Sequence, residues 1–589
     1  MKSHRVVSCQ LSVVSCKVGQ SLVEILIALG LASILLPALL TGLVASREGK
    51  AQEGQRLAAT ALLRQAEEAV RSVRENSWAS ITSTGSPFRP NDNGSSWGLL
   101  SGSEIIQGFT RQIAIADVNR DSNCNITASG GTLDPNTKKI TTAVSWTGPP
   151  SGNVTSTEYL TNLSAKPKRG LLVYGDGGTT SNAIKYRTLN PCDGTWSTPN
   201  PTASGIFSTA AVRAARLYSS PTRNEKILVT RHVAGTNNQF IYAQVFNGST
   251  WGNLVQLSSW SSSSFLNVRN FDGTYLTNGD FMVVYSDNSV TPKYRIWNGS
   301  SWGSQTNTAN VGAIPTYIVA KARPSTNEVM MATFDQTSDT NTSYFNGSSW
   351  SAAVQHSTAA PTTTKEHIDF TWSPQNSLKG ALVYPNGGSD STQNLKVWTA
   401  NGSGWSSTSD APNLGGRLGP VDIDGRKGAE TFMSCQKNAN NKIGCFLANT
   451  TPGWSTPQNN TLTNNTEGGI QRSYNFAFED SGSEGIVVYS DNTSTPKLKK
   501  YNSLSNSFDG SPSNLNTLSG VLTTIRSRPL SGSEDIFILM ATGNTLYSLL
   551  WDGTNNAVYT SPAGQAFTTH GTNGSATTDF WYDFVWDKY

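Results

Sequence analysis

The stretch "HIDFTWSPQNSLKGALVYPNGGSDSTQNLKVWTANGSGW", residues 367–405, holds three apolar segments and a final tryptophan, separated by polar turns. "HIDFTW", "ALVY" and "LKVWT" are short and rich in β-branched and aromatic residues, which is typical of strands. "NGSG" favours a tight turn because Asn and Gly accept a positive φ, and Trp405 then opens a fourth segment. The stretch therefore predicts a sheet of four short strands.

The same pattern recurs along residues 170–589. The "ALVYPN" strand has seven counterparts, among them "LLVYGD", "MVVYSD" and "IVVYSD", at steps of about 50 residues. The eight strands are centred on Tyr174, Thr230, Tyr285, Ala332, Tyr384, Ser434, Tyr489 and Ala541. Because a four-stranded repeat of this length is typical of propeller blades, we predict a mainly β fold with a β-propeller of eight four-stranded blades. Seven blades plus an irregular unit is the alternative.

The two ends of the repeat region complement each other. The region begins at "GLLVY", from Gly170, without a preceding strand, and the chain ends with "YDFVWDKY", which is similar to "HIDFTW". We expect this C-terminal strand to complete the first blade and close the ring, which leaves no free strand edge. The repeats also alternate in sequence, so the duplicated unit is a pair of blades.

Two repeated features suggest roles within the blades. The polar turn followed by Trp, as in "NGSSW" at Trp302, suits an outer strand packed between blades, so we interpret it as structural. Arg-Pro elements occur at Arg323 and Arg528, with Arg216 as a further candidate. These arginines would bind an anionic glycan if they line the central channel. The alternative is salt bridges at blade edges, with Glu225, Glu328 and Glu534 as the acids.

The N-terminal region contains a membrane-spanning candidate. Residues 22–44, "LVEILIALGLASILLPALLTGLV", are apolar except for Glu24. A helix of this length rises about 35 Å, which is enough to cross a hydrocarbon core of roughly 30 Å. Lys2, Arg5 and Lys17 precede it without any acidic residue, which places the N-terminus in the cytoplasm and the rest of the chain outside. From Glu48 the helix is expected to continue in amphipathic form.

The stretch "KVGQSLVEILIALGL" resembles the class III leader of type IV prepilins and pseudopilins. The resemblance implies that prepilin peptidase cleaves between Gly19 and Gln20, and that Glu24 neutralises the N-terminal amine of a neighbouring pilin subunit during filament assembly. Gln20 replaces the usual phenylalanine, which leaves its N-methylation open. A plain signal anchor is the alternative. The expected domains are a leader (1–19), a pilin-like helix (20–76), a small pilin-like β region (77–163), a linker (164–169) and the propeller (170–589).

Composition and motifs exclude several classes of function. Only 14% of residues are charged, and the net charge of +4 is spread without a basic stripe, so no nucleic-acid partner is expected. There is no CxxC motif and no phosphate-binding loop, and with only five histidines we expect neither a metal site nor a cofactor. Cys435 and Cys445 flank a symmetric turn sequence and could form a disulfide across a hairpin.

These observations favour a minor or tip subunit of a type IV pilus, which presents an extracellular propeller for adhesion to a surface glycan or a receptor on another cell. The subunit would reside in the cytoplasmic membrane before assembly. No acid pair is set apart by a motif, so no catalytic residue is assigned and the chain is expected not to be an enzyme. The alternatives are a membrane-tethered glycosidase-like enzyme and a pseudopilin-like component of a secretion system.

Overall fold

A computed structural model describes most of the chain. The described residues are 22–121, 124–148, 150–162, 169–176, 184–191, 194–202, 210–358, 366–385, 387, 391–401, 404–468, 472–543, 545–558, 568–572 and 580–587. The chain divides into two compact units, Met1–Ala165 and Lys166–Tyr589. Most of the expected linker at 164–169 lies outside the described residues.

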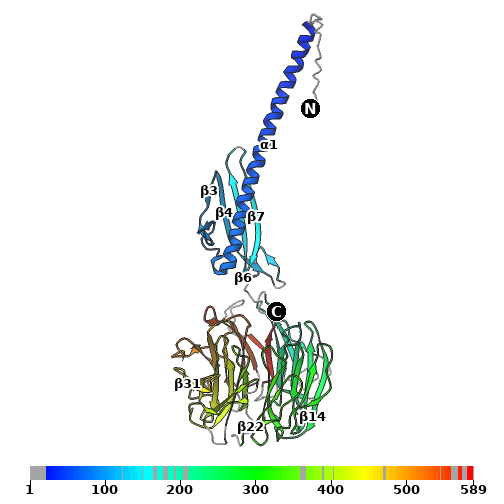
Figure 1. Ribbon diagram of the computed structural model, residues 1–589, viewed down its shortest axis with the longest axis vertical. Helices are drawn as coiled ribbons and strands as arrows, with labels where there is room; N and C mark the ends of the chain where they lie inside the picture. The colour runs from blue at the N-terminus through cyan, green and yellow to red at the C-terminus, as the bar shows by residue number, and fades with distance from the viewer. Residues whose placement is uncertain are drawn as a thin grey trace, which may run out of the picture. The chain divides into compact units, whose positions relative to one another are not determined.

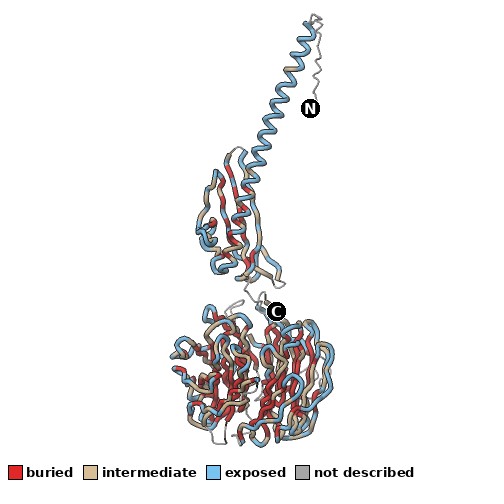
Figure 2. Tube along the Cα trace, viewed as in Figure 1, coloured by how far each residue is buried: buried red, intermediate tan, exposed pale blue. Residues whose placement is uncertain are grey.

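The first unit contains one long helix, α1 (Leu22–Asn76). Its first part is apolar and exposed, and it is long and apolar enough to cross a membrane. Its second part buries one stripe against a sheet (Figures 1 and 2). The buried helix residues recur at three- and four-residue steps, as an amphipathic helix requires. They are Ala59, Leu63, Ala66, Ala69, Val70 and Val73.

The sheet that covers α1 is antiparallel and seven-stranded, with the order β2-β1-β4-β6-β7 and with β3 and β5 paired to β4. A short 3-10 turn, η1 (Trp78–Ser80), links the helix to it. Its strands are β1 (Phe88–Asp92), β2 (Trp97–Ser101), β3 (Glu104–Ile106), β4 (Phe109–Arg120), β5 (Ile126–Thr127), β6 (Thr132–Trp146) and β7 (Gly152–Thr161). In β4 buried and solvent-facing residues alternate, so that Ile113 and Ile115 pack against Val70 of α1.

The second unit is a β-propeller of eight antiparallel sheets, numbered here as blades 1 to 8. Blade 1 contains β43 (Tyr582–Trp586), β8 (Gly170–Gly175), β9 (Ile184–Leu189) and β10 (Asn200–Pro201); blade 2 contains β11 (Ala210–Ser219), β12 (Lys226–Ala234), β13 (Asn238–Phe246) and β14 (Trp251–Ser261). Blade 3 contains β15 (Phe271–Tyr275), β16 (Phe281–Tyr285), β17 (Lys293–Trp297) and β18 (Thr306–Asn307); blade 4 contains β19 (Pro315–Ala322), β20 (Val329–Asp335), β21 (Thr340–Phe345) and β22 (Val354–Ser357).

In blades 5 to 8 two short segments share the outer-strand position. Blade 5 contains β23 (Asp369–Trp372), β24 (Lys379–Pro385), β25 (Gln393–Thr399), β26 (Gly404–Trp405) and β27 (Ser409–Asp410); blade 6 contains β28 (Leu418–Gly425), β29 (Thr431–Asn438), β30 (Ile443–Asn449), β31 (Gly453–Ser455) and β32 (Thr461–Thr463). Blade 7 contains β33 (Tyr474–Phe478), β34 (Glu484–Tyr489), β35 (Lys497–Asn502), β36 (Ser507–Phe508) and β37 (Ser513–Asn514); blade 8 contains β38 (Thr524–Pro529), β39 (Ile536–Thr542), β40 (Thr545–Asp552), β41 (Ala557–Val558) and β42 (Thr568–Thr572).

The C-terminal strand closes the ring, which confirms the sequence-based expectation. β43 pairs with β8 over five residues, with Tyr582 opposite Tyr174 and Trp586 opposite Gly170. Trp581 and Phe584 are fully buried in the core between blades 8, 1 and 2. The first blade is thus assembled from both ends of the repeat region.

The polar turns place tryptophans between blades. In the turn that begins at Asn298, the side-chain oxygen accepts the backbone N–H groups of Ser300 and Ser301, and Gly299 has a φ of 94°. The next tryptophan, Trp302, packs on Trp297 at 5.5 Å between ring centroids and donates its indole N–H to the carbonyl of Asn253 in blade 2. These contacts agree with a structural role for the turns.

Candidate functional site

One strand of each blade lines the propeller axis, and we call these the axial strands: β43, β11, β15, β19, β23, β28, β33 and β38. In the odd-numbered blades the axial strands share a short motif, visible as "YDFVW", "FDGTY", "IDFTW" and "YNFAF". Its second residue is Asp583, Asp272, Asp369 or Asn475. All eight axial strands contribute to one cavity of about 750 Å³.

The second residue of this motif joins each odd blade to the next even blade. Asp583 accepts the backbone N–H of Leu217 at 3.0 Å, and Asp272 accepts that of Ala320 at 3.1 Å. Asp369 and Asn475 make the same contact with the next blade, at 3.3 Å to Ile423 and 2.6 Å to Ser527. The blades are therefore linked in pairs, four times around the ring, and this explains the alternation in the sequence.

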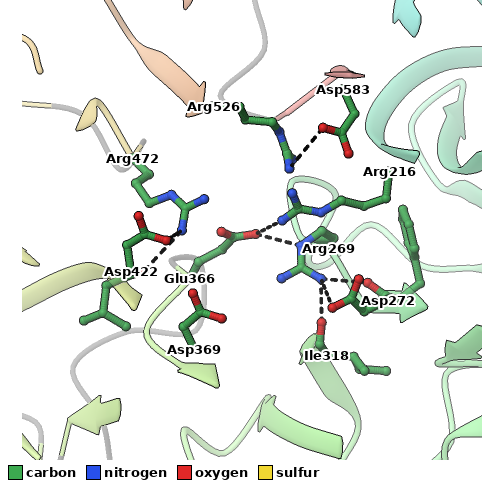
Figure 3. A network of polar contacts seen from close by, with 12 residues as sticks. Arg216, Arg269, Asp272, Ile318, Glu366, Asp369, Asp422, Arg472, Arg526 and Asp583 are labelled. Carbon is green, nitrogen blue, oxygen red and sulfur yellow. Dashed lines mark hydrogen bonds and ion pairs between the residues drawn. The ribbon is translucent and has the colours of Figure 1, made fainter. Parts of the chain in front are cut away.

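Arg269 and Glu366 form a buried ion pair in the cavity wall. The Nε of Arg269 donates to Oε1 of Glu366 at 2.8 Å, and its Nη1 donates to the carbonyls of Ile318 and Phe271 at 2.5 and 2.8 Å. Arg216 lies 3.9 Å from the same carboxylate oxygen (Figure 3). Burial alone would raise the pKa of Glu366, but Arg269, Arg472 and Arg216 together lower it to about 2.

On the opposite side of Glu366 lies a second pair, Arg472 with Asp422, whose Nη1 and Oδ1 are 2.8 Å apart (Figure 3). Asn475 also donates to Asp422. Two further acids nearby are pushed toward the neutral form. Burial and the charge of Asp422 raise the pKa of Asp369 to about 6, and burial raises the pKa of Asp424 to about 7, with contributions from Asp422 and Asp369. One cavity thus holds carboxyl groups with widely separated pKa values.

A third cluster surrounds Phe580. The guanidinium carbons of Arg526, Arg472 and Arg216 lie 4.1, 5.3 and 5.8 Å from the centroid of this ring. Asp583 is bound by Arg528 at 2.7 Å and lies 3.9 Å from Nη1 of Arg526. Cations over an aromatic face are attracted by its quadrupole. Three arginines from blades 2, 7 and 8 therefore converge on one aromatic ring.

The chemistry of this cavity suits a polar ligand. Arginine forks recognise carboxylates and other oxyanions, and the carboxylates accept hydrogen bonds from hydroxyl groups. Within the described part of the chain, no group of three or more His, Cys, Asp or Glu side chains is arranged to hold a metal ion.

The residues predicted from sequence lie in different places. Gly19 and Gln20 fall outside the described residues. Glu24 lies in the first turn of α1 and is exposed. Cys435 and Cys445 face each other on β29 and β30 and are joined by a disulfide, with their Cα atoms 4.0 Å apart.

The arginines predicted either to line the channel or to form salt bridges at blade edges do some of each. Arg216, Arg323 and Arg528 all line the cavity. Arg323 also forms the predicted salt bridge with Glu328, at 2.5 Å. Glu225 pairs instead with Arg223, at 2.6 Å. Glu534 accepts a hydrogen bond from Thr554.

Most of the cavity residues were missed by sequence reasoning. They are Arg269, Asp272, Glu366, Asp369, Asp422, Asp424, Arg472, Arg526 and Asp583. The signal was present in the axial-strand motif, because alignment of its four copies places Asp or Asn at the second residue. The third residue before that position is Phe580, Arg269, Glu366 or Arg472, so three of the four copies place a charged side chain there and the fourth places the aromatic ring.

No protein-family model and no curated protein sequence matches the chain. Solved structures match its propeller. The BP39L lectin from Burkholderia pseudomallei aligns with a TM-score of 0.43 and 10% identity, covering 58% of this chain and 96% of the lectin. The periplasmic gluconolactonase PpgL from Pseudomonas aeruginosa aligns with a TM-score of 0.37 and 12% identity, covering 60% and 96%. The dihydro-heme d1 dehydrogenase NirN aligns with a TM-score of 0.42 and 12% identity, covering 69% and 74%. At these identities the matches concern the fold alone.

The expectation that the chain is not an enzyme is corrected, because the solved structures that align with it include a gluconolactonase and a dehydrogenase as well as a lectin. The fold therefore gives no ground for excluding catalysis. No local sequence motif contains an acid pair, because Glu366, Asp422 and Asp583 reach the cavity from three separate blades.

Proposed function

We propose that this protein is a pilin-like subunit, a minor or tip component of a type IV pilus, that presents its propeller outside the cell as a ligand-binding head. The observation that supports the proposal is the division of α1. Its first part is apolar and exposed, while its second part packs on a small antiparallel sheet. A helix that exposes an apolar surface of this size needs a membrane or neighbouring subunits to cover it.

Glu24 is the residue that favours filament assembly over simple anchoring. It interrupts a run of apolar residues that includes the exposed Leu22, Val23 and Ile25. A carboxylate within hydrocarbon is costly unless a partner neutralises it, and the amine of a processed neighbouring subunit would be such a partner. The large propeller would crowd a helically packed shaft, which is why a minor or tip position is proposed.

The propeller would act as the receptor part of the subunit. Its axial cavity is large enough for a small sugar and is lined by arginine, carboxylate and aromatic side chains. Such a lining can orient a polar ligand by several directed hydrogen bonds. A surface glycan or a glycosylated receptor on another cell is the proposed ligand.

The test is to shear surface filaments from the native cell and to analyse them by mass spectrometry. We expect a peptide that begins at Gln20, together with propeller peptides, at low abundance beside a major pilin. Glu24→Ala should be processed but absent from filaments, whereas the matched control Glu48→Ala, an exposed acid further along α1, should be incorporated normally. Recovery of only uncut protein, in the membrane fraction, would contradict the pilin-like assignment.

A glycosidase-like enzyme is the second candidate function. The observation in its favour is that Glu366 and Asp369 lie in the same cavity while their pKa values are shifted in opposite directions, to about 2 and about 6. Acid and base roles are assigned to such pairs in glycoside hydrolysis. Turnover of fluorogenic glycosides by the detergent-solubilised full chain, lost in Asp369→Asn and retained in the exposed control Asp410→Asn, would favour this function. Absence of turnover across the common glycosides would reject it.

A further inference from the structure

Arg526 differs from the other arginines of the cavity. Its side chain is 1% exposed, yet the N–H groups of Nε, Nη1 and Nη2 find no hydrogen-bond acceptor among the described residues. Arg269, by contrast, donates to one carboxylate and two carbonyls. A buried guanidinium without acceptors loses its hydration without gaining hydrogen bonds in exchange, which is costly. Its donors are therefore available to a ligand.

The nearest carboxylate cannot satisfy Arg526. Asp583 Oδ1 already accepts from Nη2 of Arg528 at 2.7 Å and from its neighbour's backbone N–H at 2.9 Å, and Oδ2 accepts from Leu217. Arg528 also donates to the carbonyl of Phe584. The distance of 3.9 Å between Arg526 and Asp583 marks an ion pair without a hydrogen bond.

The surroundings of Arg526 favour an anion with a single charge. Arg216 and Arg472 share the Phe580 ring with it, so three cations converge there. Figure 3 shows these three arginines reaching from different parts of the ring toward the space around Glu366. Because the carboxylates of Glu366 and Asp583 border the same space, a dianion such as phosphate would meet more repulsion than a monoanion. A carboxylate also matches the planar fork of a guanidinium in a bidentate contact.

We propose that Arg526 binds the carboxylate of an acidic sugar, a uronic acid residue, in the axial cavity. That the ligand is a sugar rests on the proposed function of the propeller as a glycan-binding head. That the ligand carries a carboxylate rests on the contacts of Arg526 alone. Arg216 and Arg472 contribute attraction, and the carboxylates of the wall accept hydrogen bonds from the sugar hydroxyls.

The experiment uses the detergent-solubilised full chain and measures the binding of galacturonate and glucuronate by calorimetry and by the shift in Tm. We expect both uronates to bind at least about tenfold more tightly than galactose and glucose, because a charge-assisted bidentate contact contributes this much. Acetate should compete weakly, and inorganic phosphate should bind less tightly than the uronates. Arg526→Gln should weaken uronate binding by about tenfold or more.

Two variants separate binding from folding. Arg526→Met removes the buried charge and keeps the volume, so we expect a Tm at least as high as that of the natural protein and no further rise with uronate. Arg223→Gln is the matched control, because Arg223 is partly exposed, pairs with Glu225 and does not line the cavity. It should bind uronate normally.

Several results would overturn the inference. Equal binding of galactose and galacturonate, unchanged uronate binding by Arg526→Met, or preferential binding of phosphate would each reject Arg526 as a carboxylate site. Binding of neutral glycans alone would reject this inference and leave the proposed receptor function standing. Uronate binding by a protein that is never found in filaments would support the inference and contradict the pilin-like assignment.

Discussion

At the scale of single residues, a carboxyl group in the axial cavity stays ionised where arginines pair with it and tends to become protonated where they do not. Glu366 keeps its charge because three arginines surround it, whereas Asp424 has acidic neighbours. The backbone N–H groups of Phe478 and Gly425 donate to Asp424, at 3.0 Å each, and oppose the rise in its pKa only in part. The protonation of this one side chain is therefore coupled to folding.

Asp424→Asn should change how stability depends on pH. The pKa of Asp424 rises from its ordinary 3.8 to about 7 in the folded protein, so the folded chain binds more protons between these pH values. The stability that the protonated group contributes is fully present below about pH 3.8, the ordinary pKa, and is lost progressively as the pH rises to about 7. Relative to the natural protein, the variant should gain about 1–3 kcal/mol in free energy of unfolding between pH 5 and pH 8.

Urea unfolding at the two pH values measures this difference. Asp410→Asn replaces an exposed acid outside the cavity, and its free energy of unfolding should change between the two pH values by as much as that of the natural protein. A constant difference between Asp424→Asn and the natural protein at pH 5 and pH 8 would show that Asp424 does not titrate in this range.

At the scale of elements, the odd blades share a pairing of glycine with phenylalanine. In blade 5 the Phe370 ring on β23 covers Gly380 on β24, and a Cβ on that glycine would lie 2.4 Å from the ring. Blade 3 has the reverse arrangement, with Gly273 on the axial strand and Phe281 on its neighbour, and a Cβ there would lie 2.3 Å from the ring. In both blades a phenylalanine ring therefore fills the same space between the axial strand and its neighbour, although the phenylalanine comes from the axial strand in blade 5 and from the neighbouring strand in blade 3. The two blades share this packing and not the residue type at either position.

Gly380→Ala should destabilise the propeller by about 1–3 kcal/mol, because the added methyl group displaces a buried ring. Gly252→Ala is the control, since nothing lies within 4 Å of a Cβ at that strand position. The double variant Phe370→Gly with Gly380→Phe reproduces the arrangement of blade 3 and should be more stable than Phe370→Gly alone. Thermal and chemical unfolding measure the stability of all four variants. A double variant no more stable than Phe370→Gly would show that the two arrangements are not interchangeable.

The disulfide in blade 6 joins neighbouring strands of a single hairpin. It connects Cys435 and Cys445, which are both buried and are separated by 10 positions. Replacement of both by Ala should lower the free energy of unfolding by about 2–3 kcal/mol, as the closure of a short loop predicts. Reduction of the natural protein should lower the urea midpoint to that of the double variant. An unchanged midpoint after complete reduction would show that the hairpin alone holds the loop closed.

At the scale of the whole molecule, the repeat made the fold predictable. The eight blades, the closure by the C-terminal strand and the long N-terminal helix all followed from local patterns and their spacing. A strand with "VVY" must be buried, and a first blade without its axial strand must obtain one elsewhere. Such inferences need no knowledge of long-range contacts.

The candidate site could be predicted only in small part. Arg323 and Arg528 are candidate channel residues because each belongs to a visible Arg-Pro element, and Arg216 is a further candidate. Arg526 and Glu366 are not found in this way, because each is only one side chain among many until the ring brings the axial strands together. Whether Arg526 has a hydrogen-bond acceptor depends on Asp583, which lies in another blade, and no local pattern contains that information.

The closure by β43 is the feature on which the ring depends. Three of the five residues of this strand are aromatic, and together with Phe580 and Trp581 they complete the core that blade 1 shares with its neighbours. Removal of residues 580–589 should lower the free energy of unfolding by more than about 5 kcal/mol, because several buried aromatic rings are lost together. It also exposes the edge of β8, which can then pair with an added strand.

A synthetic peptide of residues 580–589 should therefore bind the truncated chain and restore its stability, as measured by a rise in Tm that saturates with peptide concentration. A scrambled peptide of the same composition should have no effect, because its residues cannot place Phe584 and Trp586 in the core and Asp583 against Leu217 at the same time. The peptide with Asp583→Ala should restore less, since it leaves Arg528 and the N–H of Leu217 without their acceptor. If the truncated chain unfolds at the same temperature as the natural protein, the ring is held by its other seven blades. β43 would then serve to complete the cavity wall rather than to close the fold.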